Sequence, residues 1–268
     1  MTLQAVDLCC VRGERRLFKG VSLSLAAGQA LRVRGANGSG KTTLLRTLAG
    51  LAHAESGEVR WQGRALAACR DEYHGQMIYL GHAAAVKDEL LAWENLVYAA
   101  RLQGRTLPRA DAEQSLAALG LARAAQLSAR SLSQGQRKRL ALARLHGAEG
   151  QSAPLWILDE PFNALDQDAV AALCAAINQH FTRGGMLVYT THTDLPLCPA
   201  QALELNLDRA TATPPAAGPA QCNATPAPSA AAAVPLAAGS TPMAAAVMPI
   251  AAGTTPSAAA PATPKASS

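Results

Sequence analysis

Gly35-Ala36-Asn37-Gly38-Ser39-Gly40-Lys41-Thr42 is the most informative segment of this 268-residue chain. It lies between an apolar segment typical of a strand and a pattern typical of a helix, which is the context that a phosphate-binding loop requires. Its glycines let backbone N–H groups turn onto phosphate oxygens, and the helix start adds a positive dipole. We therefore predict that this loop, with Thr43 in the same helical turn, binds nucleotide phosphates. Lys41 would reach the β- and γ-phosphates, and the Thr42 hydroxyl would hold Mg²⁺.

A second motif consists of two acids, Asp159 and Glu160, that follow the apolar strand pattern Leu155–Leu158. A strand that ends in acids is common, and on its own it would also fit a purely structural role. Beside a phosphate loop, however, a buried strand can deliver a carboxylate to Mg²⁺, which prefers oxygen ligands. We predict that Asp159 is a metal ligand. Glu160 would be the base or the orienting group for the attacking water.

Three further motifs decide the class of ATPase. Leu132-Ser133-Gln134-Gly135-Gln136 resembles LSGGQ, the signature of ATP-binding cassette (ABC) proteins, and lies 23 residues before Asp159. Asn163–Asp166 matches the D-loop of that family, and His192 matches its switch histidine. Singly, these motifs could be a capped helix start, a second N-cap region and a structural histidine. Together with the two motifs above, they appear in family order over residues 35–192, so the chain resembles an ABC ATP-binding subunit over residues 1–208.

The ABC resemblance implies that two copies of the chain bind ATP and Mg²⁺ between them. In this family two cassettes close head to tail, and the phosphate loop of one faces the signature of the other. Ser133 and Gly135 would then contact the γ-phosphate of the nucleotide held by the second copy. The resemblance also implies that Glu160 and His192 are catalytic and that Asp166 belongs to the D-loop. Hydrolysis would open the pair, giving a switch driven by ATP binding.

Two segments depart from the usual ABC pattern. The Q-loop normally has glutamine after the strand that corresponds to Met77–Leu80, whereas His82 stands at that place and is followed by Ala83. His82 could replace the glutamine as a metal and water contact, or it could be an ordinary loop residue. The aromatic residue that stacks on adenine is also missing, because residues 10–12 are Cys, Val and Arg. Base stacking could be weaker, or it could come from Arg12.

Among ABC proteins, the chain resembles the CcmA family, the ATP-binding subunits of the haem exporter in bacterial cytochrome c maturation. The matching stretches are Trp61–Gly63, Tyr79–His82, Glu89–Leu96 and Leu155–Asp166. Gly-His at the Q-loop is part of the likeness, although this family usually has glutamine directly after that histidine. The resemblance implies a peripheral protein on the cytoplasmic face of the bacterial inner membrane. It would partner an integral permease subunit resembling CcmB, with CcmC, and would power haem export or release to the periplasm.

Other classes of function remain open from the residues alone. Another ABC importer or exporter would share every catalytic motif and differ only in its membrane partner. A non-transport nucleotide sensor could use the same fold; Glu160 argues against it, and the missing Q-loop glutamine favours it. Ribosome-acting ABC proteins mostly carry two cassettes, and DNA-acting ones insert long coiled coils. Neither pattern is seen here, so we expect no nucleic-acid partner.

The order of the predicted elements indicates an α/β fold. Strand patterns occur at Leu3–Cys10, Val21–Leu25, Ala30–Arg34, Glu58–Trp61, Met77–Leu80, Leu155–Leu158, Met186–Thr190 and Ala202–Leu207. Helix patterns occur at Thr42–Ala49, Trp93–Leu102, Pro108–Leu119, Gln134–Leu145 and Asp166–Phe181. We predict a P-loop NTPase of ABC type with an N-terminal antiparallel β portion. A helical subdomain would be inserted at about residues 83–146.

The C-terminal segment differs sharply in composition from the rest. Residues 211–268 hold 11 of the 16 prolines, have no aromatic residue, and carry Lys265 as their only charge. Such a segment cannot build a core. We therefore predict an ABC ATP-binding domain at residues 1–208 and a disordered tail rich in Ala, Pro, Thr and Ser at residues 209–268. A partner-binding linker of polyproline type is the alternative.

Charge and hydropathy bound the environment of the chain. The net charge of +5 is mild and fits either nucleotide phosphate or an anionic membrane surface. The six cysteines include no Cys-x-x-Cys pair, which favours reduced thiols in the cytosol. No segment approaches 18 uninterrupted apolar residues, and Asp7 interrupts the place where a signal peptide would need an apolar run. We expect any membrane role to come through a partner.

Overall fold

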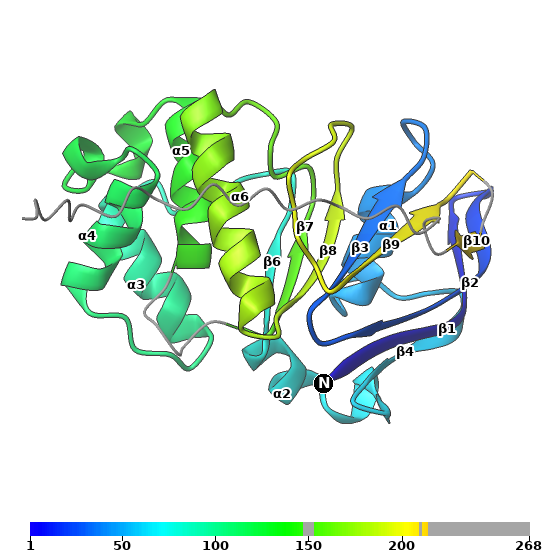
Figure 1. The fold of residues 1–268 in the computed structure, drawn as a ribbon. Coiled ribbons are helices and arrows are strands. Elements are labelled where there is room, and N and C mark those ends of the chain that lie inside the picture. Colours follow the sequence, from blue (N-terminus) through cyan, green and yellow to red (C-terminus); the bar gives the residue numbers. More distant parts are fainter. Residues whose placement is uncertain (147–152, 209–210, 214–268) are drawn as a thin grey trace, which may run out of the picture. The chain divides into compact units, whose positions relative to one another are not determined.

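A six-stranded sheet carries the phosphate loop near its centre. The computed structural model describes residues 1–146, 153–208 and 211–213, and it orders the strands of this sheet β10-β9-β3-β8-β7-β6 (Figure 1). The bounds are Gln29–Arg34 (β3), Met77–Leu80 (β6), Leu155–Leu158 (β7), Met186–Thr190 (β8), Gln201–Asn206 (β9) and Thr211–Thr213 (β10). All pairs are parallel except β9 with β10. The carboxyl ends of β3, β6, β7 and β8 therefore meet at one edge of the sheet.

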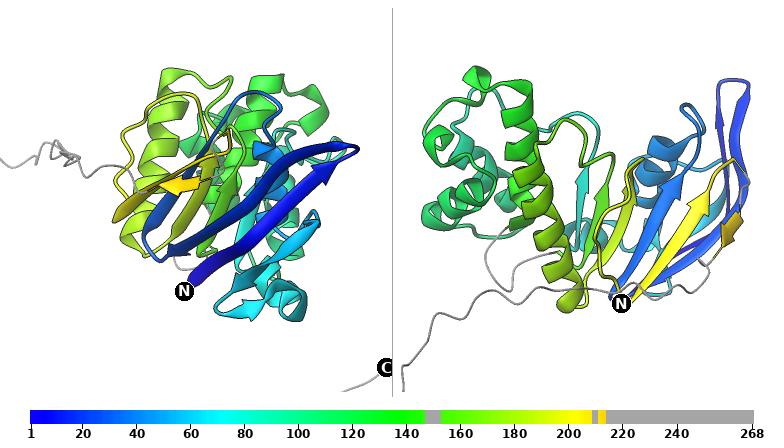
Figure 2. Two further views of the ribbon diagram at one scale, coloured as in Figure 1. Left: turned by 90° about the vertical axis from the view of Figure 1, so that its right-hand side faces the viewer. Right: turned by 45° about the horizontal axis from the view of Figure 1, so that its top comes forward.

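A second, antiparallel sheet is formed mainly by the N-terminal part of the chain. Its order is β2-β1-β4-β5, with bounds Thr2–Arg12 (β1), Arg15–Ala26 (β2), Ser56–Trp61 (β4) and Arg64–Ala65 (β5). The long β1–β2 hairpin is prominent in both views of Figure 2. Helix α1 (Lys41–Leu48) buries Leu44, Leu45 and Leu48 in the core that contains side chains from both sheets. The predicted antiparallel β portion is thus confirmed.

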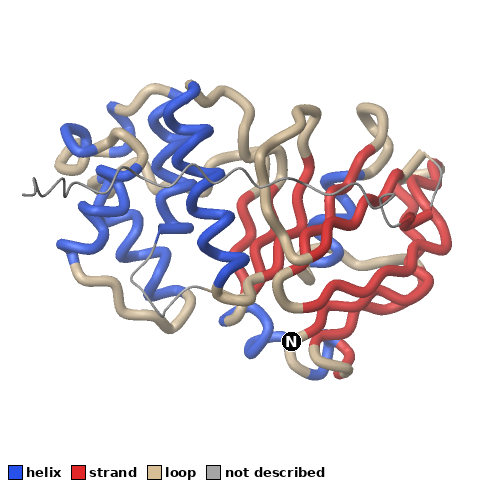
Figure 3. Tube along the Cα trace, in the orientation of Figure 1, coloured by secondary structure: helices blue, strands red, loops and turns tan. Residues whose placement is uncertain are grey.

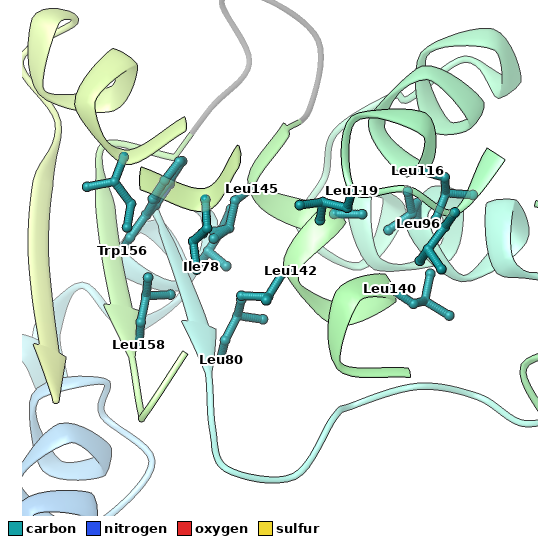
Figure 4. Close-up of a cluster of buried hydrophobic side chains, with 14 of the residues drawn as sticks. Ile78, Leu80, Leu96, Leu116, Leu119, Leu140, Leu142, Leu145, Trp156 and Leu158 are labelled. Atoms are coloured by element: carbon teal, nitrogen blue, oxygen red, sulfur yellow. The ribbon is translucent and has the colours of Figure 1, made fainter. Parts of the chain in front are cut away.

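Strand β7 shows how the sheet separates two cores. Leu155 and Ile157 point into the core that holds α1, whereas Trp156 and Leu158 point into the core on the other face. All four side chains are at most 2% exposed, because a strand of a parallel sheet is covered on both faces. Helix α6 (Gln167–Thr182) and the inserted helices cover the face of the sheet opposite α1, where the side chains around Trp156 pack together (Figure 4).

The inserted helices lie between β6 and β7 in the chain. They are α3 (Ala92–Leu102), α4 (Arg109–Ala118) and α5 (Gln134–Leu142), and Figure 3 shows them gathered away from the strands. Helix α5 ends three residues earlier than predicted, and a 3-10 turn, Ala143–His146, follows it. The short helix α2 (Arg70–Gly75) was not predicted, because six residues are too few for a helical period to stand out. Within the described residues, no helix is both long and apolar enough to cross a bilayer.

Three residues of the predicted tail belong to the sheet. Thr211–Thr213 form β10 and pair with Glu204–Asn206 of β9, so the prediction of a tail was wrong for these residues. The composition of the segment did not indicate this strand, because three residues that extend a sheet edge leave no hydrophobic pattern. The remaining residues of the predicted tail lie outside the described part of the chain.

His180 on α6 gives a testable pH dependence of stability. Its ring stacks on Trp156 with centroids 3.9 Å apart, and it is only 4% exposed. Burial lowers the pKa of His180 to about 4. The unfolded chain, whose histidine pKa is roughly 6.5, binds this proton more readily. The contribution of neutral His180 to the free energy of unfolding is therefore fully present above about pH 6.5. It falls toward pH 4, by up to ~1.4 kcal/mol per pH unit.

The measurement is the free energy of urea unfolding at several pH values between 7 and 4.5. We expect the free energy of unfolding of His180→Phe to depend less steeply on pH than that of the wild type. Some pH dependence should remain, because burial also lowers the pKa of His146. His53 is exposed, so His53→Gln serves as the control and should keep the wild-type slope. Equal slopes in the wild type and His180→Phe would contradict the expectation.

Candidate functional site

A hydrogen bond joins the two predicted metal ligands across 117 residues of sequence. Thr42 Oγ1 donates to Asp159 Oδ2 at 2.7 Å, so the first turn of α1 meets the carboxyl end of β7. Asp159 is 3% exposed, and its other oxygen accepts a 2.8 Å bond from Thr190 Oγ1. A hydroxyl and a carboxylate beside a phosphate loop are the oxygen ligands that suit Mg²⁺. The residues at this position therefore fit the predicted metal.

The phosphate loop holds its lysine by backbone contacts. Lys41 is 9% exposed, and its Nζ donates to the carbonyl oxygens of Gly35 at 2.8 Å and Ala36 at 3.1 Å. Gly38 and Gly40 have φ values of +81° and +102°, which residues with a Cβ rarely adopt. Helix α1 begins directly after Gly40, so its free N–H groups face the loop. The loop is therefore shaped to place a cation and amide donors together.

The other residues of the loop differ in exposure and in their hydrogen bonds. Asn37 is exposed at the rim, whereas Ser39 donates its N–H to Ala36 O at 3.1 Å. The Ala36 N–H donates to the Asp208 carboxylate at 3.0 Å, and Thr43 O accepts from the Thr47 hydroxyl. Asp208 thus contacts the predicted site, a role that its position after the last long strand did not suggest.

Glu160 lies in a constrained backbone conformation next to its predicted catalytic partner. Its φ is +49°, a value that costs a non-glycine residue roughly 1–3 kcal/mol. The Glu160 N–H donates to Thr190 Oγ1 at 2.7 Å, and its carboxylate accepts a bond from the Asn163 amide. His192 Nε2 lies 3.7 Å from Glu160 Oε1. The structure therefore brings the two predicted catalytic residues together.

Lys138 joins this site from the inserted helices. Lys138 lies on the signature helix α5, and its Nζ donates to the Glu160 carbonyl oxygen at 3.1 Å. Burial lowers the pKa of Lys138, and the nearby charges of Asp159 and Glu160 oppose that shift. The sequence did not indicate Lys138 as a site residue, because a basic residue on a helix is typical of a solvated face. Thr190 was also missed as a bridge between Asp159 and Glu160, because its neighbours in space come from another strand.

His82 faces a cavity shared with the predicted metal site. The cavity measures about 310 Å³, and Thr42, His82, Lys138 and Pro161 are among its lining residues. His82 follows the carboxyl end of β6 and is exposed. Because Thr42 lines the same cavity, this position is compatible with the metal and water contact that we considered for the Q-loop. That role remains a prediction.

The signature and the D-loop form two capped helix starts. Ser133 caps α5: its Oγ accepts from the Gln136 N–H at 3.2 Å, and the Gln136 side chain accepts from the Ser133 N–H at 2.9 Å. Asp166 caps α6 by accepting from the Ala169 N–H at 2.9 Å. Ser133 is exposed, and in the described part of the chain no hydrogen bond joins Ser133 or Gly135 to the phosphate loop. The predicted contact of Ser133 and Gly135 with a second copy remains a prediction.

The β1–β2 hairpin supplies no aromatic ring in the stretch predicted to face adenine. Cys10 points into the core, where burial raises the pKa of its thiol, and its Sγ lies 3.7 Å from Thr47 Oγ1. Val11 and Arg12 are exposed at the end of β1. The exposure of Arg12 is compatible with a contact to the base. That contact remains a prediction.

Comparisons with known proteins agree with this geometry. A family model described as ABC transporter matches residues 18–163. The cytochrome c biogenesis ATP-binding export protein CcmA of Aromatoleum aromaticum is 47% identical over 205 residues, which cover 76% of this chain and 95% of that protein. The CcmA protein of Dechloromonas aromatica is also 47% identical over 205 residues, covering 76% and 99%.

Solved structures show the same fold. An ATP-binding subunit of an ABC transporter has a TM-score of 0.67 at 25% identity, covering 77% of this chain and 87% of that one. A dimeric ATP-binding cassette in a post-hydrolysis state, bound to ADP and Pi, has a TM-score of 0.66 at 22% identity, covering 76% and 94%. At that identity the second likeness shows the fold alone.

Proposed function

Because the chain belongs to the ABC transporter family and, within it, to the CcmA family of cytochrome c biogenesis ATP-binding export proteins, we propose that it powers haem export or release to the periplasm. The observation that carries the ATPase part is the 2.7 Å bond between Thr42 and Asp159, with Glu160 and His192 beside it. The haem part rests on the 47% identity to the CcmA relatives.

The site residues divide the hydrolysis of ATP among them. Lys41 and the loop amides bind the β- and γ-phosphates. Thr42 and Asp159 would hold Mg²⁺, which neutralises phosphate charge when it is bound. Glu160 orients a water molecule and accepts its proton as the water oxygen attacks the γ-phosphorus. The bond from that phosphorus to the ADP oxygen breaks, and His192 helps to keep Glu160 and the γ-phosphate aligned.

A second copy of the chain completes each ATP site in this proposal. Ser133 and Gly135 sit at the N-terminus of α5, where free N–H groups and the helix dipole favour an anion. The exposure of Ser133 at this helix start supports a contact with the nucleotide of the other copy. Head-to-tail closure would then place the two helix starts over two γ-phosphates.

The membrane partner would dock beside the cavity that His82 lines. Residues 81–91 connect β6 to α3, and the exposed Lys87 and Glu89 give this segment charges of both signs. Buried Asn95 fixes the segment by accepting from the Lys87 N–H at 2.7 Å and donating to the Lys87 and Leu91 carbonyls. We propose that this surface binds a permease resembling CcmB, with CcmC, on the cytoplasmic face of the bacterial inner membrane. No nucleic acid takes part.

The test is co-purification with the membrane subunit, followed by haem and ATPase assays. Lys87→Ser with Glu89→Ser is expected to reduce co-purification and c-type cytochrome formation while the isolated chain keeps its ATPase rate. The control pair Glu14→Ser and Lys19→Ser lies on the β1–β2 hairpin, is also exposed, and should change neither readout. Normal cytochrome formation in cells that lack this chain would point instead to another ABC transporter. Undiminished co-purification of the double variant would reject the docking surface.

A further inference from the structure

Arg32 on β3 contacts the loop that carries His192 at three places. Its Nη1 donates to Asp194 Oδ1 at 2.6 Å, and its Nη2 donates to the carbonyl oxygens of Thr193 at 3.1 Å and Thr191 at 3.5 Å. The Arg32 side chain is 14% exposed, whereas that of Asp194 is 89% exposed. One guanidinium therefore holds the carbonyls on both sides of His192.

The sheet order explains why Arg32 can reach this loop. Strand β3 lies beside β8, and Arg32 is paired in register with Tyr189, the residue before the end of β8. The loop that turns away at Thr190 therefore starts next to the arginine. Two residues beyond Arg32, β3 ends and the phosphate loop begins at Gly35. Arg32 thus connects the base of the phosphate loop to the loop of the switch histidine.

We propose that Arg32 is a positioning residue that holds His192 at Glu160. The rigid fork of a guanidinium can serve several acceptors at once, which a single ammonium cannot do in one geometry. The Thr193 N–H also donates to Thr191 Oγ1 at 3.2 Å, so the loop has an internal bond as well. The inference rests on the proposed ATPase function, because it assigns a role within that reaction.

A neighbouring arginine provides the matched control. Arg34 lies on the same strand and pairs with Glu204 at 3.4 Å, with side chains 45% and 37% exposed. The side-chain acceptor of Arg34 within the described residues is Glu204, which lies on β9 and not on the histidine loop. Exposed pairs of this kind contribute little to stability. A loss of activity specific to Arg32 would therefore reflect the loop and not a general effect of removing charge from β3.

The first experiment is steady-state kinetics of ATP hydrolysis by the full chain. Arg32→Gln is expected to lower kcat by about 10- to 100-fold with little change in KM, since displacements near 1 Å can cost that much. Arg32→Lys should give an intermediate loss, and Asp194→Asn a smaller one, because the carbonyl contacts remain. Arg34→Gln should match the wild type. An unchanged kcat in Arg32→Gln would overturn the proposal.

The second experiment separates positioning from a structural role. In a His192→Ala background, Arg32→Gln should lower kcat no further, whereas a structural contribution would add its own loss. Hydrogen–deuterium exchange of a peptide spanning residues 190–196 should speed up in Arg32→Gln and stay unchanged in Arg34→Gln. Additive losses, or equal exchange in both variants, would reject the role. If the wild type did not hydrolyse ATP, alone or with its membrane partner, the proposed function would fail, while the exchange result would still test the contact.

Discussion

Glu160→Gln is expected to lower kcat for ATP hydrolysis by about 10²- to 10⁴-fold, the range that a positioned general base contributes, while ATP still binds. The amide of glutamine has the shape of the carboxylate and can still accept a bond from Asn163, but it cannot take the proton of the attacking water. Phosphate release in the steady state gives kcat, and titration with a fluorescent ATP analogue gives the affinity.

The matched control is Glu55→Gln, which removes the same charge from an exposed glutamate before β4. It should leave kcat and ATP affinity unchanged. A Glu160→Gln variant that retains more than about a tenth of wild-type turnover would show that another group accepts the proton. A wild-type chain that binds ATP without turnover, alone and with its membrane partner, would favour the nucleotide sensor.

Lys41→Ala is expected to weaken ATP binding by about 10- to 100-fold, the loss that follows removal of charge-assisted hydrogen bonds. The Lys41 ammonium is held at the loop by the Gly35 and Ala36 carbonyls, within the segment predicted to bind the phosphates. Equilibrium titration with a fluorescent ATP analogue measures the loss. The control is Lys19→Ala, which removes an exposed lysine from β2 and should keep wild-type affinity.

The same variant tests whether two copies share each site. At ATP concentrations below the weakened affinity of Lys41→Ala, the variants Lys41→Ala and Ser133→Arg should each hydrolyse ATP much more slowly than the wild type, since each damages both sites of a symmetric pair. In a mixed pair, one site would carry both lesions and the other would be intact. Co-expression of the two variants should therefore restore measurable hydrolysis. If the mixture is as inactive as its components, the shared site is rejected.

The motifs that could be identified from the sequence are contiguous in the chain. The phosphate loop Gly35–Thr42, the acids after Leu155–Leu158 and the capped start at Ser133 each depend on a few neighbouring residues, so their spacing shows in the chain itself. The bounds of β6, β7 and β8 matched the predicted strands for the same reason, because apolar runs between turns mark buried strands. The predicted α/β class with an inserted helical part followed from the order of these elements.

The contacts within the site depended on the tertiary structure. The bond from Thr42 to Asp159 exists because α1 follows β3, while β7, which ends before Asp159, is separated from β3 by β8 alone. Thr190 became a bridge, and Arg32 a contact of the histidine loop, for the same reason. Strand order and register bring together side chains that are 30 to more than 150 residues apart, and no local pattern records such neighbours. The predicted phosphate-binding residues can therefore be identified from the sequence alone, whereas the groups that hold the predicted catalytic residues in place depend on the packing of the sheet.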